Sequence, residues 1–316
     1  MTDSPQEKFS VLIIGCGAIA GGYDAEDIEG PNILTHAKAF KLHDGFNLAG
    51  CLDTDLKIAQ DFADSWGVEK AYKNLEEAMA DRNFDIISIC TSTPGHVPYL
   101  RQLQKYNVRF VFCEKPIADD LQAAREMAAL YPDNMAVNYI RRFDPKIRRL
   151  ARGIQDKKYG SLLSGEARYT KGLYNNGSHM ADLIGMLLGK ITVKASDAII
   201  YDFWPDDPTI SATLEVACGG QIDLIGSDVA AGMVFDLELM FDQAIIRLTD
   251  FSQALAIKPV NGPETIFRTT PNREMLDAVS NIYDHLTEGA ELQSKAVNGL
   301  SALETCEDIR RMAGIS

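Results

Sequence analysis

Residues 11–20 read Val-Leu-Ile-Ile-Gly-Cys-Gly-Ala-Ile-Ala, an apolar run that ends directly in a glycine-rich turn. The turn fits the pattern G-x-G-x-x-G/A, with Gly15, Gly17 and Ala20 at its fixed positions. The first glycine allows the tight turn, the second lets the backbone approach a pyrophosphate, and the third small residue keeps helix and sheet close. The start of the following helix supplies amide donors and a positive dipole end. The turn therefore predicts a dinucleotide site made by Gly15, Cys16, Gly17, Ala18, Ile19 and Ala20; a turn without a ligand is the alternative.

Short apolar runs alternate with helical patterns over the first 140 residues. Each run is nearly continuous in apolar residues, which is typical of parallel strands covered on both faces. The expected strands lie at 11–15, 46–52, 84–90, 108–112 and 135–138. We therefore expect an α/β fold in which residues 1–140 form a doubly wound, dinucleotide-binding domain.

The pattern changes after about residue 150. Alternating segments follow one another at 162–170, 194–203, 209–217, 220–226, 233–241 and 243–249. A run of successive strands indicates one open, mostly antiparallel sheet, so we expect residues 141–290 to form an α+β substrate and oligomerisation domain. Two apolar stripes at helical spacing come next, and we expect the last helix, within 291–316, to return to the first domain.

Composition narrows the class of protein. The net charge of −14 argues against a nucleic-acid partner, which would require a basic surface. No apolar run reaches the roughly 18–20 residues of a membrane span, and the polar N-terminus does not resemble a signal peptide. The six cysteines include no C-x-x-C pair, so we expect neither a disulfide scaffold nor a metal site. These features favour a soluble, cytoplasmic protein.

Asp53 ends the second expected strand, where an acidic side chain accepts hydrogen bonds from the adenosine ribose hydroxyls. Thr54 follows, with no arginine or lysine beside it to hold a 2′-phosphate, which favours NAD over NADP. Asp53 lies 38 residues after Gly15, whereas the usual offset is ~20. The excess falls at 21–35, which is either a cover for the cofactor or substrate or a plain surface excursion.

Polar motifs stand at the ends of later strands. Glu114, Lys115 and Pro116 end one strand, so Lys115 is expected at the carboxyl edge of the sheet, where open α/β folds bind ligands. A T-x-x-P-x-H segment (Thr91–His96) precedes this motif, and R-F-x-P and G-x-H-x-x-D segments follow it. In this order the set resembles the glucose–fructose oxidoreductase / inositol dehydrogenase family (Gfo/Idh/MocA).

The resemblance implies a role for each matching residue. Lys115 corresponds to the lysine that hydrogen-bonds the reacting oxygen of the substrate, and His179 to the residue that exchanges a proton with the substrate hydroxyl. Pro116 corresponds to a proline often preceded by a cis peptide. Cofactor-contacting positions are Thr91, Ser92, Thr93, Pro94, His96, Glu114, Lys115 and Arg142. Substrate-contacting positions are Lys115, Asn138, Lys171, Asn175, Asn176, His179 and Asp182.

These roles make chemical sense. Removing a hydride from a carbinol carbon requires the hydroxyl proton to leave as the carbonyl forms. Histidine, with an ordinary pKa near ~6.5, accepts and returns a proton at neutral pH. An ammonium group at the same oxygen stabilises alkoxide character, a contribution of roughly 2–4 kcal/mol for comparable donors. Taken singly, a lysine at a strand end is usually a solvated charge, and a histidine opening a helix is often a cap.

Two features bear on the substrate. Many sugar and polyol dehydrogenases of the family carry an aspartate four residues before the histidine, where this chain has Asn175; the amide puts oxidation of a simple polyol in doubt. Basic residues also crowd into 141–152, which indicates either an exposed helix face or a pocket for a phosphate-bearing substrate. The basic residues are Arg141, Arg142, Lys146, Arg148, Arg149 and Arg152, with Arg168 and Lys171 as further candidates.

The sequence thus predicts an NAD-dependent oxidoreductase that transfers a hydride to or from a hydroxyl or keto carbon of a sugar or sugar nucleotide. An NAD-retaining enzyme that uses transient oxidation for elimination, epimerisation or glycoside cleavage is one alternative. A non-enzymatic dinucleotide-sensing regulator is the other. The resemblance further implies a homodimer or homotetramer.

Overall fold

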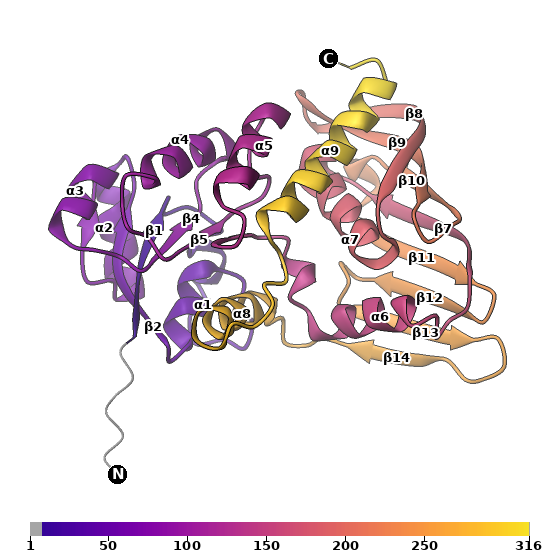
Figure 1. Ribbon diagram of the computed structural model, residues 1–316, viewed down its shortest axis with the longest axis horizontal. Helices are drawn as coiled ribbons and strands as arrows, with labels where there is room; N and C mark the ends of the chain where they lie inside the picture. The colour runs from indigo at the N-terminus through magenta and orange to yellow at the C-terminus, as the bar shows by residue number, and fades with distance from the viewer. Residues whose placement is uncertain (1–7, 316) are drawn as a thin grey trace, which may run out of the picture. The chain divides into compact units, whose positions relative to one another are not determined.

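The computed structural model describes residues 8–315, which form two compact units (Figure 1). The first unit combines Met1–Phe143 with Pro271–Val297, and the second combines Asp144–Thr270 with Asn298–Ser316. These ranges differ from the predicted ones, because the chain returns to the first unit at 271–297 and leaves it again at the start of its last helix.

The first unit contains a six-stranded, wholly parallel sheet, as predicted. Its strands are β1 (Phe9–Ile14), β2 (Phe46–Leu52), β3 (Ala71–Tyr72), β4 (Ile86–Ile89), β5 (Phe110–Cys113) and β6 (Met135–Val137). Their order, β3-β2-β1-β4-β5-β6, is that of a doubly wound dinucleotide-binding fold. The strand order reverses between β1 and β4, and ligands of such folds bind in the crevice at this reversal.

Helices cover both faces of this sheet. They are α1 (His36–Leu42), α2 (Leu56–Trp66), α3 (Leu75–Asp81), α4 (Thr93–Leu103), α5 (Leu121–Leu130) and α8 (Glu274–Glu288). In Figure 1, α4 and α5 lie above the sheet and α1 and α8 below it. Side chains of Asp55, Asn74 and Asp120 cap α2, α3 and α5 by accepting backbone hydrogen bonds.

The glycine turn does not lead straight into a regular helix, which corrects our expectation. Residues 17–22 make a single helical turn, in which the Gly21 amide donates to the Gly17 carbonyl at 3.2 Å. Regular helix resumes only at α1, where the amides of His36 and Ala37 donate to the carbonyls of Ile19 and Ala20 at 3.3 and 2.8 Å. The insertion at 21–35 therefore interrupts one helix. The turn before the insertion and α1 after it remain joined by these hydrogen bonds.

The insertion is fixed to the first unit by Asp24. This carboxylate is buried and accepts hydrogen bonds from the amides of Leu34 and Thr35 and from the Thr35 hydroxyl, at 2.7–3.0 Å. The buried Lys38 ammonium lies 3.7 Å from the same carboxylate and donates to the Asp27 carbonyl. These contacts join both ends of the insertion to the start of α1.

The second unit contains an eight-stranded sheet, mostly antiparallel as predicted. Its strands are β7 (Leu162–Tyr169), β8 (Ile191–Trp204), β9 (Asp207–Val216), β10 (Gln221–Gly226), β11 (Phe235–Phe241), β12 (Ala244–Thr249), β13 (Ala254–Pro259) and β14 (Thr265–Arg268). The order is β14-β13-β12-β11-β7-β10-β9-β8, and only β7 and β10 pair in parallel. β13 and β14 were not among the predicted strands.

Three helices, α6 (Pro145–Gln155), α7 (Ser178–Leu188) and α9 (Ala296–Met312), belong wholly or mainly to the second unit. The last helix was expected to return to the first domain, but Cys306 and Ile309 of α9 belong to the core of the second unit. The return is made by α8 instead, because its apolar stripe of Met275, Val279 and Ile282 completes the core of the first unit.

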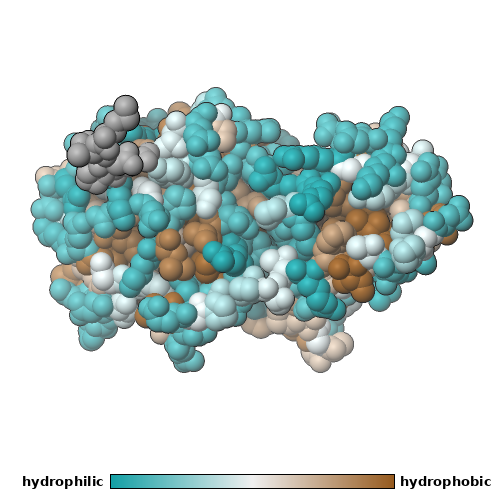
Figure 2. All heavy atoms as spheres, turned by 90° about the horizontal axis from the view of Figure 1, so that it is seen from below, coloured by the Kyte–Doolittle hydropathy of each residue, from teal (hydrophilic) through white to brown (hydrophobic). Residues whose placement is uncertain are grey.

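The visible surface is predominantly hydrophilic, with scattered hydrophobic patches (Figure 2). Among residues 8–315, no helix combines the length and the apolar character that crossing a bilayer requires. All six cysteines are free thiols, and only Cys218 is exposed.

Candidate functional site

The glycine turn after β1 approaches the end of β4 closely. Gly15 has a φ of +86°, and a Cβ on it would lie 2.9 Å from the amide nitrogen of Thr91. A larger residue is therefore excluded both by conformation and by space. At Gly17 a Cβ would meet no described atom within 4 Å, so the backbone here borders open space. This arrangement fits a pyrophosphate that approaches the main chain at Gly17.

Asp53, directly after β2, joins the end of that strand to the turn. Its Oδ2 accepts from the Cys16 amide at 3.0 Å, and its Oδ1 accepts from the Asp55 amide at 3.1 Å. The Cys16 bond fixes the carboxylate beside the glycine turn, where an acidic residue meets the ribose in folds of this order. Thr54 is exposed, and the neighbouring positions are acidic.

The segment at 91–96 follows β4 and opens α4. The buried Thr91 hydroxyl oxygen has no hydrogen-bond partner among residues 8–315. The ring of His96 is fully buried, with Nδ1 2.8 Å from the Pro116 carbonyl oxygen and Nε2 3.0 Å from that of Thr91. Burial lowers the pKa of His96 against the opposing effect of these carbonyls, so the neutral ring donates one of the two bonds. His96 thus joins the ends of β4 and β5 and does not itself face open space.

Glu114 follows β5 and opens a buried hydrogen-bond network. Its Oε1 accepts from His36 Nε2 at 2.8 Å and from Asn138 Nδ2 at 2.6 Å. His36 is fully buried, and its Nδ1 lies 2.8 Å from the Ser88 hydroxyl. The sequence analysis did not identify His36 or Ser88, since neither belongs to a recognisable motif. The Lys115–Pro116 peptide is cis, as the resemblance implied.

In this network, His36 and Glu114 each favour the charged form of the other. Burial lowers the pKa of His36, but the Cys90 thiol and the Glu114 carboxylate outweigh that effect and raise it to about 10. Burial in turn raises the pKa of Glu114, but His36, Asn138 and the charge of Lys115 lower it below its ordinary value. At neutral pH the pair is therefore an imidazolium and a carboxylate.

Asn138 follows β6, and its side-chain oxygen accepts no hydrogen bond from residues 8–315. Its backbone amide donates to the Cys113 carbonyl at 2.8 Å, and its side-chain nitrogen donates to Glu114. The side chain is 4% exposed, and Oδ1 has no partner among residues 8–315. Because an unsatisfied buried acceptor is costly, this atom fits a ligand that donates a hydrogen bond at the sheet edge.

In the second unit the predicted substrate residues lie on a π-helix, η3 (Gly172–Gly177), and on the first turns of α7. Lys171 precedes η3 with a φ of +70°, Asn175 and Asn176 lie within it, and His179 and Asp182 follow on α7. Single π-helical turns are rare and often occur at functional sites. His179 is half-buried and Asp182 is buried.

Two aspartates of the β8–β9 hairpin hold η3 in place. Asp207 accepts from the amides of Tyr174 and Asn175 at 2.8 and 3.0 Å, and Asp202 accepts from the Lys171 amide at 2.8 Å. These bonds satisfy amides at the start of the helix, which would otherwise lack partners. Neither aspartate belongs to a motif that the sequence reveals.

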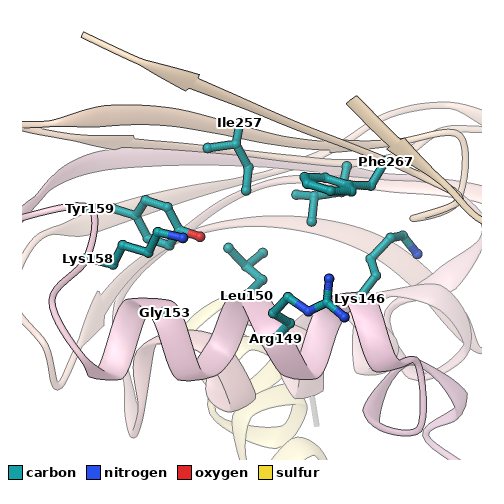
Figure 3. Close-up of a pocket in the computed structure, with 9 residues that line it drawn as sticks. Lys146, Arg149, Leu150, Gly153, Lys158, Tyr159, Ile257 and Phe267 are labelled. Atoms are coloured by element: carbon teal, nitrogen blue, oxygen red, sulfur yellow. The ribbon is translucent and has the colours of Figure 1, made fainter. Parts of the chain in front are cut away.

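The basic residues do not form one anion pocket with Arg168 and Lys171. Arg168 pairs with Glu166 at 2.7 Å on β7, and the Lys171 ammonium lies 4.5 Å from the ring centre of Phe203. Arg149 and Arg152 are exposed on α6, as the alternative of a solvated helix face predicted. Three cations do border a mainly apolar cavity of about 100 Å³ between α6 and the β13–β14 hairpin (Figure 3). Its lining residues are Lys146, Arg149, Leu150, Gly153, Lys158, Tyr159, Leu255, Ile257 and Phe267.

The predicted residues thus form two groups. Those of the first unit stand at the carboxyl ends of β1, β2, β4, β5 and β6 in one sheet. Those of the second unit stand on η3 and α7, and Arg142 ends a 3₁₀ turn (Ile140–Arg142) after β6. Among residues 8–315, no three His, Cys, Asp or Glu side chains are grouped to hold a metal ion.

Comparisons with known proteins agree with this geometry. Residues 9–139 match the family described as "Oxidoreductase family, NAD-binding Rossmann fold" (GFO_IDH_MocA). The chain is 24% identical to inositol 2-dehydrogenase of Rhizobium meliloti over 300 residues, 85% of this chain and 89% of that one.

Two solved structures share the whole fold. The WlbA dehydrogenase of Bordetella pertussis, in complex with NADH and UDP-GlcNAcA, superposes with a TM-score of 0.80 at 15% identity over 98% of this chain and 97% of that one. KijD10, a 3-ketoreductase of Actinomadura kijaniata in complex with NADP and TDP-benzene, does so with a TM-score of 0.78 at 14% identity over 96% and 98%.

The parallel sheet and its glycine turn make the first unit a dinucleotide-binding domain. Over residues 9–139 the chain is similar to the Gfo/Idh/MocA family of NAD-binding oxidoreductases, and over 300 residues it is similar to an inositol 2-dehydrogenase.

Proposed function

We propose that the protein is an NAD-dependent dehydrogenase or reductase acting on a hydroxyl or keto carbon of a sugar or sugar nucleotide. The observation that carries the proposal is the position of Lys115. It is the second residue after β5, at the edge of the sheet where Gly17 borders open space and where Asn138 Oδ1 lacks a partner among residues 8–315. The names of the relatives, an inositol dehydrogenase and two enzymes bound to nucleotide ligands, support this substrate class.

The cofactor would be held by the glycine turn and by Asp53, with Thr91 and Glu114 on the nicotinamide side. When bound, NAD accepts or returns the hydride. The choice of NAD over NADP rests on the acidic end of β2, where Asp53 and Asp55 would repel a 2′-phosphate.

Two side chains would bind the substrate hydroxyl and exchange its proton. Lys115 donates a hydrogen bond to the reacting oxygen and stabilises its negative charge as the proton leaves. His179 accepts that proton during oxidation and returns it during reduction. Asn175, Asn176 and Asp182 would hold the remaining hydroxyls of the substrate, because they flank His179 on η3 and α7.

Asp53→Ala tests the cofactor assignment. We expect the affinity for NAD to fall roughly 10–100-fold, because hydrogen bonds to a charged group contribute about 1.5–3 kcal/mol. The preference for NAD over NADP should fall as well, since the negative charge that opposes a 2′-phosphate is lost. Titration of both cofactors by calorimetry measures these changes. Asp53→Asn is the matched control, since its amide oxygen still accepts from the Cys16 amide; unchanged NAD affinity in Asp53→Ala would refute the assignment.

A screen of polyols, keto-sugars and sugar nucleotides tests the activity itself. Absorbance at the NADH band is followed in both directions, with Lys115→Met as the inactive control. Substrate-dependent change in the wild type supports the proposal. Product formation without net NADH, accompanied by uptake of solvent deuterium, would replace it with the NAD-retaining alternative; the absence of any turnover across the three classes would overturn the sugar assignment.

We further propose a homodimer or homotetramer assembled through the face of the second sheet opposite its helices. Ion pairs such as Glu238–Arg247 alternate on this sheet with half-exposed apolar residues such as Ile245. Light scattering coupled to size exclusion gives the oligomeric state directly.

A further inference from the structure

The strongest unexplained feature is the buried pair of His36 and Glu114 beside Lys115. His36 is fully buried at the start of α1, with its Nε2 2.8 Å from Glu114 Oε1. Its Nδ1 lies 2.8 Å from the Ser88 hydroxyl, so the protonated ring has an acceptor at each nitrogen. Its ring also lies 4.5 Å from that of Phe112, which fixes its plane.

Ionisable groups at the ends of two neighbouring strands face this ring. They are the Glu114 carboxylate after β5 and the Cys90 thiol after β4, whose Sγ also lies 3.6 Å from the Ser88 hydroxyl. Burying a carboxylate without a countercharge costs free energy of folding. A single neutral amide such as that of Asn138 does not offset the charge. The imidazolium supplies the missing charge: its Nε2 lies 2.8 Å from the carboxylate, and the pKa of His36 is raised above its ordinary value.

The charge of Glu114 matters because Lys115 is its neighbour in the chain. The two residues are adjacent in the chain, and the charge of Lys115 contributes to the lowering of the Glu114 pKa. By the same interaction, an uncompensated Glu114 would attract the ammonium group, raise its proton affinity and reduce the field it exerts elsewhere. A positive charge in contact with Glu114, such as that of a His36 imidazolium, opposes this effect.

We propose that His36 is a positioning residue for Lys115: it fixes and neutralises Glu114, so that the ammonium charge remains available to the substrate oxygen. The inference rests on the proposed role of Lys115. It explains why a fully buried histidine stands where the helix resumes after the insertion, with its ring in contact with Glu114 at the end of β5.

His96 provides a matched comparison. It too is fully buried, and it contacts the carbonyl of Pro116 on the other side of Lys115. Its partners are backbone carbonyls and carry no net charge. Replacement of His96 should therefore disturb packing without changing the electrostatic surroundings of Lys115.

The test measures the pKa of Lys115 in the free protein by NMR of ¹³C-methylated lysines, with Lys115→Arg to assign the signal. In His36→Gln, which keeps an N–H donor but no charge, we expect the pKa of Lys115 to rise by roughly 0.5–1 pH unit. The double variant His36→Gln/Glu114→Gln, which removes both charges, should return it to the wild-type value. His96→Gln should leave it unchanged.

Activity provides a second readout. His36→Gln should lower kcat roughly tenfold, with KM and the Kd for NAD nearly unchanged. If His36→Gln does not fold, Ser88→Ala weakens the same pair and should shift the Lys115 pKa in the same direction. An unchanged Lys115 pKa in a folded variant overturns the inference. Because this measurement needs neither substrate nor NAD, it is independent of the proposed function, which fails instead if Lys115→Met retains turnover.

Discussion

Replacing Lys115 with methionine is expected to lower turnover by roughly 10²–10³-fold, because a donor aimed at developing negative charge contributes about that factor. Methionine preserves the length and the apolar stem of the side chain but removes the charge and the three donors. The loss should fall on kcat, since the interaction with the reacting oxygen is strongest when that oxygen carries alkoxide character. Steady-state kinetics on the substrate found by the screen measures it.

Lys115→Arg is the matched control for charge. It retains a positive group of different shape, so activity should lie between those of the wild type and Lys115→Met. Binding of NAD and the midpoint of thermal unfolding should change little in both variants, since Lys115 is half-buried and its neighbour Glu114 keeps both hydrogen bonds. Turnover of Lys115→Met within a fewfold of the wild-type rate would show that the lysine has no part in the reaction.

The first sheet could be predicted from the sequence because buried parallel strands are nearly continuous apolar runs. Five of its six strands were predicted within a few residues, and the sixth, β3, is only two residues long. In the second unit the signal was weaker. All four residues of β14 are exposed and β13 ends in a proline, so neither shows the alternation that identifies a half-buried strand.

It was harder to predict which strands pair with each other than to predict which segments form strands. The parallel contact of β7 with β10 joins segments separated by two other strands, and no local pattern encodes it. The prediction of where the last helix packs was wrong for a similar reason. Both α8 and α9 carry apolar stripes, and only the shapes of the two cores decide that α8 completes the first and α9 the second.

Some residues of the candidate site could be predicted from the sequence, and others could not. Gly15, Asp53 and Lys115 could be predicted, because each follows a strand of the parallel sheet and carries a side chain or conformation with a known use there. His36 could not, since the insertion displaces it from the glycine turn and nothing in its own segment indicates burial against Glu114. Asp202 and Asp207 were missed because they act on η3 from the next two strands along the chain.

His179→Gln is expected to cost roughly 10²–10⁴-fold in turnover, the usual contribution of a positioned general base. Glutamine can hydrogen-bond a substrate hydroxyl but cannot accept its proton at neutral pH, so substrate affinity should suffer much less than kcat. The oxidation rate of the variant should rise with pH where that of the wild type has levelled off, because hydroxide then replaces the missing base. A pH–rate profile in the oxidative direction measures both effects.

Asn175→Asp is the informative companion variant, because it places the aspartate common in the family one helical turn before His179. Here the Asn175 amide donates to the Lys171 carbonyl at 3.2 Å and to Asn176 Oδ1 at 3.3 Å, and a carboxylate would repel both oxygens. We therefore expect this variant to destabilise η3, while its negative charge raises the pKa of a neighbouring imidazole. The oxidation profile should then shift to higher pH only if His179 is the base. A profile of Asn175→Asp that coincides with that of the wild type, together with near-normal turnover in His179→Gln, would assign proton transfer to another group.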